Sequence, residues 1–194
     1  MPQRMPPTND QRRHFLLEML PPGSVGAEIG VHLGDFSQVI LETVAPRQLH
    51  LIDPWIYNPA PEYERALYGG RSEGGQSEMD ERHMSVLDRF GPEINRGQII
   101  VHRGESAEML GALPDASLDW VYIDGNHTYD FVVQDLRLSL AKTKPGGLVT
   151  GDDYGEGGWW DGGVKQAVDE LAESGNAQLL LIQNGQFAFA VTGT

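Results

Sequence analysis

The sequence contains no cysteine among its 194 residues, and basic side chains are few. The absence of cysteine excludes disulfides, zinc–thiolate sites and thiol catalysis. Lysine and arginine together number 14 against 28 aspartate and glutamate residues, so the formal net charge is −14. No stretch is basic enough to neutralise a run of phosphates, and we therefore expect no nucleic-acid partner. The same charge disfavours binding to an anionic membrane surface.

Long apolar runs are also missing from the sequence. No run approaches the roughly 20 residues that span a membrane, and residues 1–7 lack the apolar core of a signal peptide. We therefore expect a cytoplasmic protein. The length is sufficient for one complete core. Residues 1–22 are expected to form an N-terminal helical segment, and residues 23–194 a single domain with a polar insertion at about 57–76.

Apolar residues alternate between strand-like and helix-like spacing along most of the chain. Strands are predicted at residues 27–31, 48–52, 99–102, 118–123, 148–150, 178–182 and 187–191. Helices are predicted from about Thr8 to Leu20, from 35 to 44, from 78 to 90, from 129 to 140 and from 163 to 173. This alternation predicts an α/β fold with a Rossmann-like, doubly wound and mostly parallel sheet. Asn184-Gly185 predicts a terminal hairpin that adds one antiparallel strand.

The most informative segment is Gly26-Ala-Glu-Ile-Gly-Val-His-Leu-Gly34, followed by His50-Leu-Ile-Asp-Pro-Trp55. An apolar strand leads into a glycine turn that opens a helix, and the next strand ends in an acid, an arrangement that holds a nucleoside. Dinucleotide sites normally read Gly-x-Gly-x-x-Gly, whereas this turn reads Glu-x-Gly-x-x-x-Gly. The Glu28 carboxylate would repel a pyrophosphate and attract a cation. S-adenosylmethionine (SAM), which has an ammonium, a sulfonium and no phosphate, is therefore the better candidate.

Several predicted cofactor contacts fall at the carboxyl ends of strands, where parallel sheets bind ligands. We expect Asp53 to accept the ribose hydroxyls and Trp55 to flank the adenine. Glu105 and Ser106 would meet the adenine edge, and Glu28 would take the methionine ammonium. Each residue also has an ordinary alternative role, in a tight turn, at a strand end or in the first turn of a helix. Their coincidence on successive strand ends favours the nucleoside site.

Acidic residues also follow the fourth and fifth predicted strands, in Asp124-Gly-Asn-His127 and Gly151-Asp-Asp-Tyr154. Carboxylates that converge there need a positive partner, and Mg²⁺ with two or three carboxylates meets that need. Asp152 and Asp153 reach one ion only if the chain turns directly after the strand. Helix capping is the alternative role for Asp124.

His127 is the predicted general base, because neutral histidine near pH 7 can take a hydroxyl proton and a nearby cation would lower the pKa of that hydroxyl. A solvated loop histidine is the alternative. Trp159-Trp160 could stack on an acceptor as part of a lid, or pack the loop down onto the sheet.

Read together, these motifs resemble those of class I SAM-dependent methyltransferases. The segments that carry the resemblance are 28–34, 51–54, 121–129, 144–147, 151–154 and 163–168. The closest likeness is to the small single-domain group related to macrocin-type sugar O-methyltransferases, over residues 24–192. The resemblance implies a seven-stranded sheet, a Mg²⁺-dependent transfer to a hydroxyl, metal ligands at Asp124, Asp152 and Asp153, and a histidine base at His127. The cofactor residues it implies are Glu28, Gly30, Val31, Gly34, Ser37, Asp53, Trp55, Gly104, Glu105, Ser106 and Asp124.

The predicted function is Mg²⁺-assisted O-methylation of a small hydroxylated acceptor, either a sugar or a natural product. The chain departs from the macrolide-sugar enzymes in lacking their large additional N-terminal region, so the acceptor does not carry over. Segment 57–76 is expected to shape the acceptor pocket, with a homodimer as the expected assembly. One alternative is a SAM-binding module without catalysis. Another is a metal-dependent hydroxylase or hydrolase on the same sheet.

Overall fold

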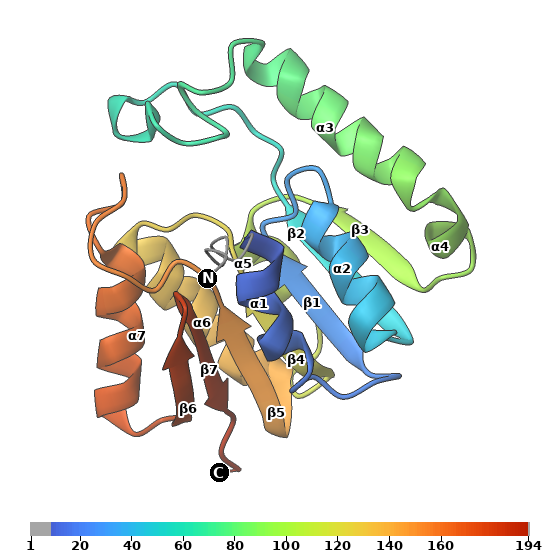
Figure 1. Cartoon of the computed structure of the whole chain (residues 1–194). Coiled ribbons are helices and arrows are strands. Elements are labelled where there is room, and N and C mark those ends of the chain that lie inside the picture. Colours follow the sequence, from blue (N-terminus) through green and yellow to red (C-terminus); the bar gives the residue numbers. More distant parts are fainter. Residues whose placement is uncertain (1–8, 194) are drawn as a thin grey trace, which may run out of the picture.

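The computed structural model describes residues 9–193, which form one seven-stranded sheet in the order β3-β2-β1-β4-β5-β7-β6 (Figure 1). The strands are β1 (Val25–Ile29), β2 (Gln48–Asp53), β3 (Ile99–Arg103), β4 (Leu118–Ile123), β5 (Thr143–Gly151), β6 (Gln178–Gln183) and β7 (Gln186–Ala190). The first five strands are parallel to one another, and β7 is antiparallel to both β5 and β6. The predicted fold class and the terminal hairpin are therefore confirmed.

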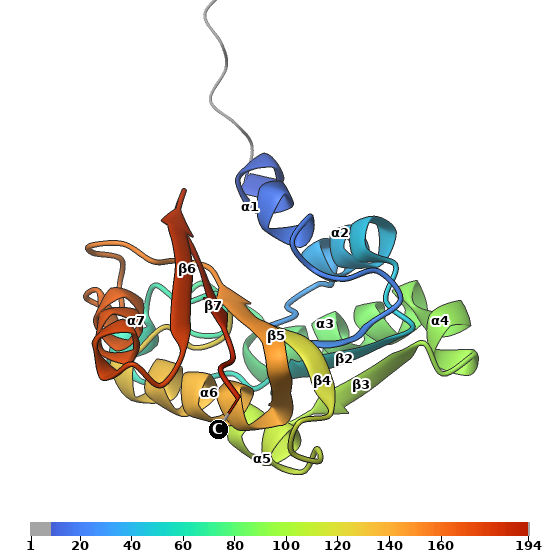
Figure 2. The ribbon, with the colours of Figure 1, turned by 90° about the horizontal axis from the view of Figure 1, so that it is seen from below.

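Helices cover both faces of the sheet (Figure 2). One face packs against α1 (Asn9–Leu17), α2 (Asp35–Val44) and α3 (Gly75–Arg89), and α4 (Gly91–Asn95) follows α3 directly. The other face packs against α5 (Ser106–Gly111), α6 (Tyr129–Lys142) and α7 (Gly163–Ser174). Trp120 and Tyr122 of β4 point into the first core, and Val121 and Ile123 into the second. This alternation buries β4 on both faces, as expected for a central strand.

Most element boundaries agree with the sequence-based predictions, and the differences have local causes. β1 ends at Ile29, two residues before the predicted end, because Gly30 has a φ of 88° and cannot continue a strand. β5 begins at Thr143, five residues early, and its register against β4 shifts between Leu118 and Trp120. The six-residue helix α5 was not predicted, because so short a segment carries little periodicity.

The N-terminal helix is tied to the core, although Thr8, its predicted cap, lies outside the described residues. Leu16, Leu17 and Leu20 are buried in the same core as α2 and the sheet. Within residues 9–193, no helix is both long and apolar enough to cross a membrane.

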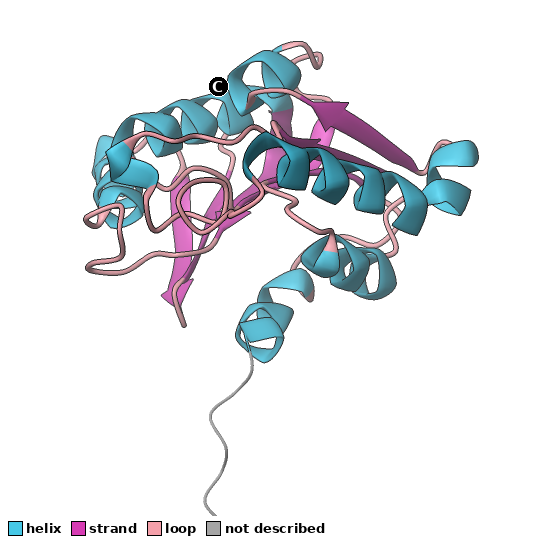
Figure 3. Ribbon diagram, turned by 90° about the horizontal axis from the view of Figure 1, so that it is seen from above, coloured by secondary structure: helices cyan, strands magenta, loops and turns pink. Residues whose placement is uncertain are grey.

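Two long connections meet over the carboxyl ends of the strands. The β2–α3 connection contains the short 3₁₀ helix η1 (Pro61–Tyr63), and the β5–α7 connection contains Trp159 and Trp160. Seen from above, both lie over the same end of the sheet (Figure 3). They enclose the space in which the predicted site residues are found.

Candidate functional site

A cavity of about 540 Å³ opens where the sheet order reverses, between the carboxyl ends of β1 and β4. This is the position at which open α/β sheets bind ligands. The predicted site residues in its lining are Glu28, Gly30, Val31, Asp53, Trp55, Glu105, Ser106, Asp124, His127 and Asp153. The other four predicted residues, Gly34, Ser37, Gly104 and Asp152, are not part of this lining.

The floor of the cavity depends on Gly30, the first residue after β1. Its φ of 88° favours glycine, and a Cβ placed there would lie 2.0 Å from the carbonyl oxygen of Asp124. The two segments approach this closely because the Asp124 amide donates to the carbonyl of Ile29 at 2.7 Å. Gly30 therefore permits the close contact between the β1 and β4 ends. Gly34 has another role, since a Cβ there would lie 2.7 Å from the Phe90 ring.

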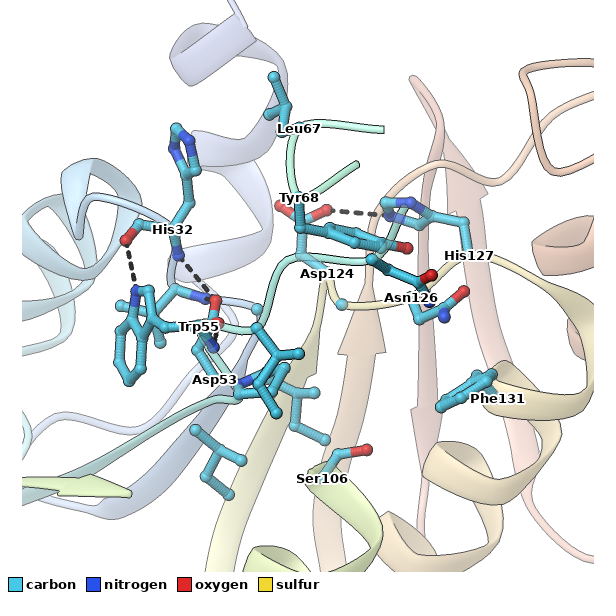
Figure 4. Close-up of a pocket in the computed structure, with 18 of the residues that line it drawn as sticks. His32, Asp53, Trp55, Leu67, Tyr68, Ser106, Asp124, Asn126, His127 and Phe131 are labelled. Atoms are coloured by element: carbon cyan, nitrogen blue, oxygen red, sulfur yellow. Dashed lines mark hydrogen bonds and ion pairs between the residues drawn. The ribbon is translucent and has the colours of Figure 1, made fainter. Parts of the chain in front are cut away.

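Asp53, at the end of β2, organises the loops on both sides of it (Figure 4). Its Oδ2 accepts hydrogen bonds from the amides of Val31 at 2.9 Å and His32 at 3.0 Å. Its Oδ1 accepts from the amide of Trp55 at 2.8 Å. The Trp55 indole in turn donates to the carbonyl of His32 at 2.9 Å. Burial raises the pKa of Asp53, although these amide hydrogen bonds oppose the rise.

Glu28 is a buried carboxyl group at the inner end of the cavity. It is 1% exposed and accepts a hydrogen bond from the hydroxyl of Ser37, which thereby orients the Glu28 carboxyl group. Burial raises the pKa of Glu28 to about 8, which leaves the group largely protonated at neutral pH. A cationic ligand group at this end would favour its ionised form.

The β3–α5 loop supplies a third side of the cavity. The Gly104 amide donates to the carbonyl of Asp53 at 3.1 Å, which joins this loop to the end of β2. Ser106 donates to the buried carboxyl of Asp135 at 2.5 Å, and Glu105 is exposed in the lining. Asp135 was not singled out in the sequence, because its position within a helix carries no motif.

His127 lies between two carboxylates across the cavity from Asp53 (Figure 4). Its Nε2 is 3.3 Å from Oδ1 of Asp124 and 3.1 Å from Oδ2 of Asp153. Asp153 reaches it because the chain turns directly after β5, where Asp153 has a φ of 61°. Burial lowers the pKa of His127, but the hydrogen bond and charge of Asp124 and the charges of Asp153 and Asp152 outweigh it, so the pKa is raised.

Asp152 points away from this cluster, toward β7 and α1. Its carboxylate pairs with Arg13 and accepts a hydrogen bond from the Gln186 amide. Arg13 also donates to Oδ2 of Asp124 at 2.7 Å, so one guanidinium joins the ends of β4 and β5. The role of Arg13 could not be predicted from the sequence, because nothing in the helix pattern distinguishes it from a surface arginine.

The predicted metal ligands are therefore divided between two arrangements. Donor atoms of Asp124, His127 and Asp153 all lie within 4.8 Å of one another, a spacing that can hold a divalent cation. Two carboxylates suit Mg²⁺, whereas an imidazole nitrogen is a ligand that transition metals accept readily. Asp152 fits the same ion only after it leaves Arg13.

Aromatic side chains from the two long connections form the outer wall of the cavity. The Tyr63 and Trp159 rings are 5.4 Å apart, and Tyr68 is 6.1 Å from Trp159. The ring of Trp160 packs against the imidazole of His127, with 4.8 Å between the ring centres and an angle of 41° between the ring planes. Trp159 and Trp160 are half-buried and line the cavity. Both thus border the space where a ligand would lie, and Trp159 also packs against Tyr63 and Tyr68 of segment 57–76.

One family of known protein sequences matches the chain. Residues 27–154 match a family described as a methyltransferase domain. No curated protein sequence matches the chain significantly.

Solved structures share the fold at low sequence identity. The O-methyltransferase NovP is 21% identical, with 94% of this chain and 80% of NovP covered and a TM-score of 0.61. The O-methyltransferase TomG from Streptomyces achromogenes, solved with SAM, is 16% identical over 98% of this chain and 83% of its own, with a TM-score of 0.62. A putative rRNA methylase from Clostridium thermocellum is 10% identical over 97% and 98%, with a TM-score of 0.65.

Proposed function

The chain belongs to the methyltransferase domain family, and we propose that it transfers the methyl group of SAM to a hydroxyl oxygen of a small acceptor. The chain shares its fold with solved methyltransferases, and its cavity lies where α/β sheets bind ligands. The O-methyltransferases NovP and TomG are among the proteins with this fold. The choice of oxygen as the methylated atom depends on the residues opposite the cofactor.

The observation that carries the proposal is the position of His127 across the cavity from the cofactor half, defined as Glu28, Gly30, Asp53, Trp55 and Ser106. Glu28 offers a buried partner for the ligand's ammonium, and the Gly30 turn admits a ligand close to the backbone. SAM, when bound, supplies an electrophilic methyl group next to this region.

The acceptor half is defined as Tyr63, Tyr68, His127, Trp159 and Trp160. His127 would take the hydroxyl proton as the acceptor oxygen bonds to the methyl carbon that SAM supplies, with the sulfur as leaving group. The aromatic rings exclude water and hold the acceptor oxygen near the methyl group. The wall they form suits a ring-bearing acceptor of small size.

The proton acceptor must be neutral before it can work, and its two carboxylate neighbours oppose this. Asp124 and Asp153 raise the pKa of His127, so neutralising them favours the basic form. A divalent cation, when bound, would lower the pKa of the acceptor hydroxyl and offset the carboxylate charge. Asp124 and Asp153 would hold it, with Asp152 joining after release from Arg13.

The test compares His127→Ala with His14→Ala, a change at an exposed histidine outside the cavity lining. A panel of phenols, catechols and sugars is screened for SAM-dependent methylation, and SAM affinity is measured by calorimetry. Loss of the general base is expected to lower kcat by about 100-fold to 10,000-fold. SAM affinity should stay within about twofold for both variants, because His127 lies across the cavity from the cofactor half. Normal turnover in His127→Ala would contradict the proposed role.

A further inference from the structure

The guanidinium of Arg13 lies between two of the carboxylates that are predicted to bind a metal ion. Nη1 is 2.7 Å from Oδ2 of Asp124, and Nη2 pairs with Oδ2 of Asp152. Among the described side chains, Arg13 is the one cationic partner of Asp152, and Asp124 has in addition only His127. The two carboxylates at the ends of β4 and β5 thus already share an internal positive charge.

Besides the two carboxylates, an aromatic ring and the packing of its own helix hold Arg13 in position. Its side chain is 14% exposed, and its guanidinium carbon lies 5.1 Å from the centre of the Phe36 ring. The helix that carries it is held by Leu16 and Leu17, which are buried in the core. Arg13 is therefore held in a defined position within the site, unlike an arginine on the surface.

We propose that Arg13 competes with a divalent cation for Asp124 and Asp152, and that an ion held by both of these carboxylates requires Arg13 to leave the pair. Asp153 remains available to an ion in both states, since its carboxylate is not paired with Arg13. Because Arg13 belongs to α1, its departure would loosen the first turns of that helix from the site.

This inference extends the metal-assisted part of the proposed function, but its test needs no methyl transfer. Binding of Mn²⁺ is measured by electron paramagnetic resonance in the wild type, Arg13→Gln, Arg13→Lys and Arg96→Gln. Arg96 pairs with Glu93 on an exposed surface, so Arg96→Gln removes the same charge away from the site. If the state without the Arg13 pair is populated at one tenth or less, Arg13→Gln should bind Mn²⁺ at least about tenfold more tightly.

Arg13→Lys is expected to fall between the wild type and Arg13→Gln, because an ammonium cannot bridge two carboxylates in the bidentate manner of a guanidinium. It also keeps the positive charge if Arg13→Gln proves unstable. Equal Mn²⁺ affinity in the wild type, both Arg13 variants and the control would overturn the competition, as would an equal gain in Arg96→Gln. In either case SAM binding and the His127 test would still stand. Absence of Mn²⁺ binding in every variant would overturn both this inference and the metal assistance.

A separate observation concerns the rim of the cavity, where arginines gather despite the net charge of −14. Arg65 and Arg71 of segment 57–76 line the cavity and are exposed. Neither has an ion-pair partner among the described side chains, whereas Arg82 beside them is paired with Glu78. In a strongly acidic protein, unpaired arginines at one cavity mouth attract anions to that point.

We infer that the acceptor is a ring compound with an anionic group, such as a carboxylate, that meets Arg65 and Arg71 while its hydroxyl faces His127. The aromatic wall lines the same cavity and accommodates the ring. This inference rests on the proposed function, since it names the acceptor of that site. A neutral sugar would leave both guanidinium groups without a partner.

The probes are 3,4-dihydroxybenzoate and its uncharged analogue 3,4-dihydroxybenzamide, titrated into protein saturated with S-adenosylhomocysteine. The acid is expected to bind at least about fivefold more tightly than the amide, and the double variant Arg65→Gln/Arg71→Gln should lose this preference. The control is Arg89→Gln/Arg96→Gln, which removes two charges outside the cavity lining. A preference that is absent in the wild type, or that survives in the Arg65/Arg71 variant, would overturn the inference. So would failure of both compounds to bind, whereas loss of S-adenosylhomocysteine binding itself would contradict the proposed function.

Discussion

The two halves of the cavity are built in different ways. The cofactor half is held by the backbone: Asp53 fixes the amides of Val31, His32 and Trp55, and Gly30 allows β1 and β4 to touch. The acceptor half is held by side chains that meet from separate loops, such as Tyr63 and Trp159. Backbone constraints demand particular residue types, whereas aromatic packing accepts several. Single substitutions in the cofactor half should therefore cause large losses of ligand binding, and those in the acceptor half smaller ones.

The largest expected effect is at Gly30. Gly30→Ala places a Cβ 2.0 Å from the Asp124 carbonyl oxygen at a φ of 88°, so the β1 and β4 ends must separate. We expect SAM affinity to fall by 100-fold or more, roughly 3 kcal/mol or above. Calorimetry measures the loss. Gly23→Ala is the matched control, because Gly23 has a φ of 67° but open space around it. It should cost about 1–2 kcal/mol of stability and leave SAM affinity unchanged.

A smaller effect is expected at Asp53. Asp53→Asn keeps the shape but replaces one acceptor oxygen with an NH₂ group, which faces backbone amides that also donate. Charged hydrogen bonds of this kind contribute about 1.5–3 kcal/mol each, so SAM affinity should fall by roughly tenfold to 100-fold. Asp35→Asn is the control, since Asp35 also lines the cavity but pairs with an exposed arginine. Equal losses of SAM affinity in the two variants would contradict the role assigned to Asp53.

The buried carboxyl of Glu28 should make SAM binding depend on pH. With its pKa raised to about 8 by burial, Glu28 is mostly protonated at pH 6, and the ligand's ammonium favours the ionised form. Affinity should therefore rise with pH, by up to about tenfold per unit between pH 6 and 7.5, with release of a proton on binding. The ligand's own amine titrates near pH 8, so the comparison stays below that value. Glu28→Gln should give a nearly flat profile, and a flat profile in the wild type would contradict this account of Glu28.

The smallest effect of a single substitution on ligand binding is expected in the acceptor half. Trp159→Ala removes the ring that meets Tyr63 and Tyr68, but the remaining aromatic side chains can close part of the gap. We expect the KM for a methylated acceptor to rise by about tenfold, with SAM affinity unchanged. A loss of SAM affinity as large as that of Gly30→Ala would mean that the two halves are not separable.

The difference between the halves also explains what the sequence could predict. Gly30 and Asp53 were found because strand ends and turns restrict residue type and spacing, and the sheet followed from alternating apolar periods. Arg13 and Asp135 were not found, because each lies within a helix and meets the site only through the tertiary fold. The split of Asp152 from Asp153 depends on the turn at Asp153, whose φ of 61° no pattern specifies.

The central claim is that the cofactor half forms a complete SAM site on its own. The most direct measurement is a calorimetric titration of the wild-type protein with SAM, once with Mg²⁺ and once with excess EDTA, without any acceptor. We expect one SAM per chain to bind in both solutions, with affinities within about threefold of each other, because Asp124 is the one member of the candidate metal cluster among residues 9–193 that borders that half. Absence of SAM binding in both solutions would contradict the account.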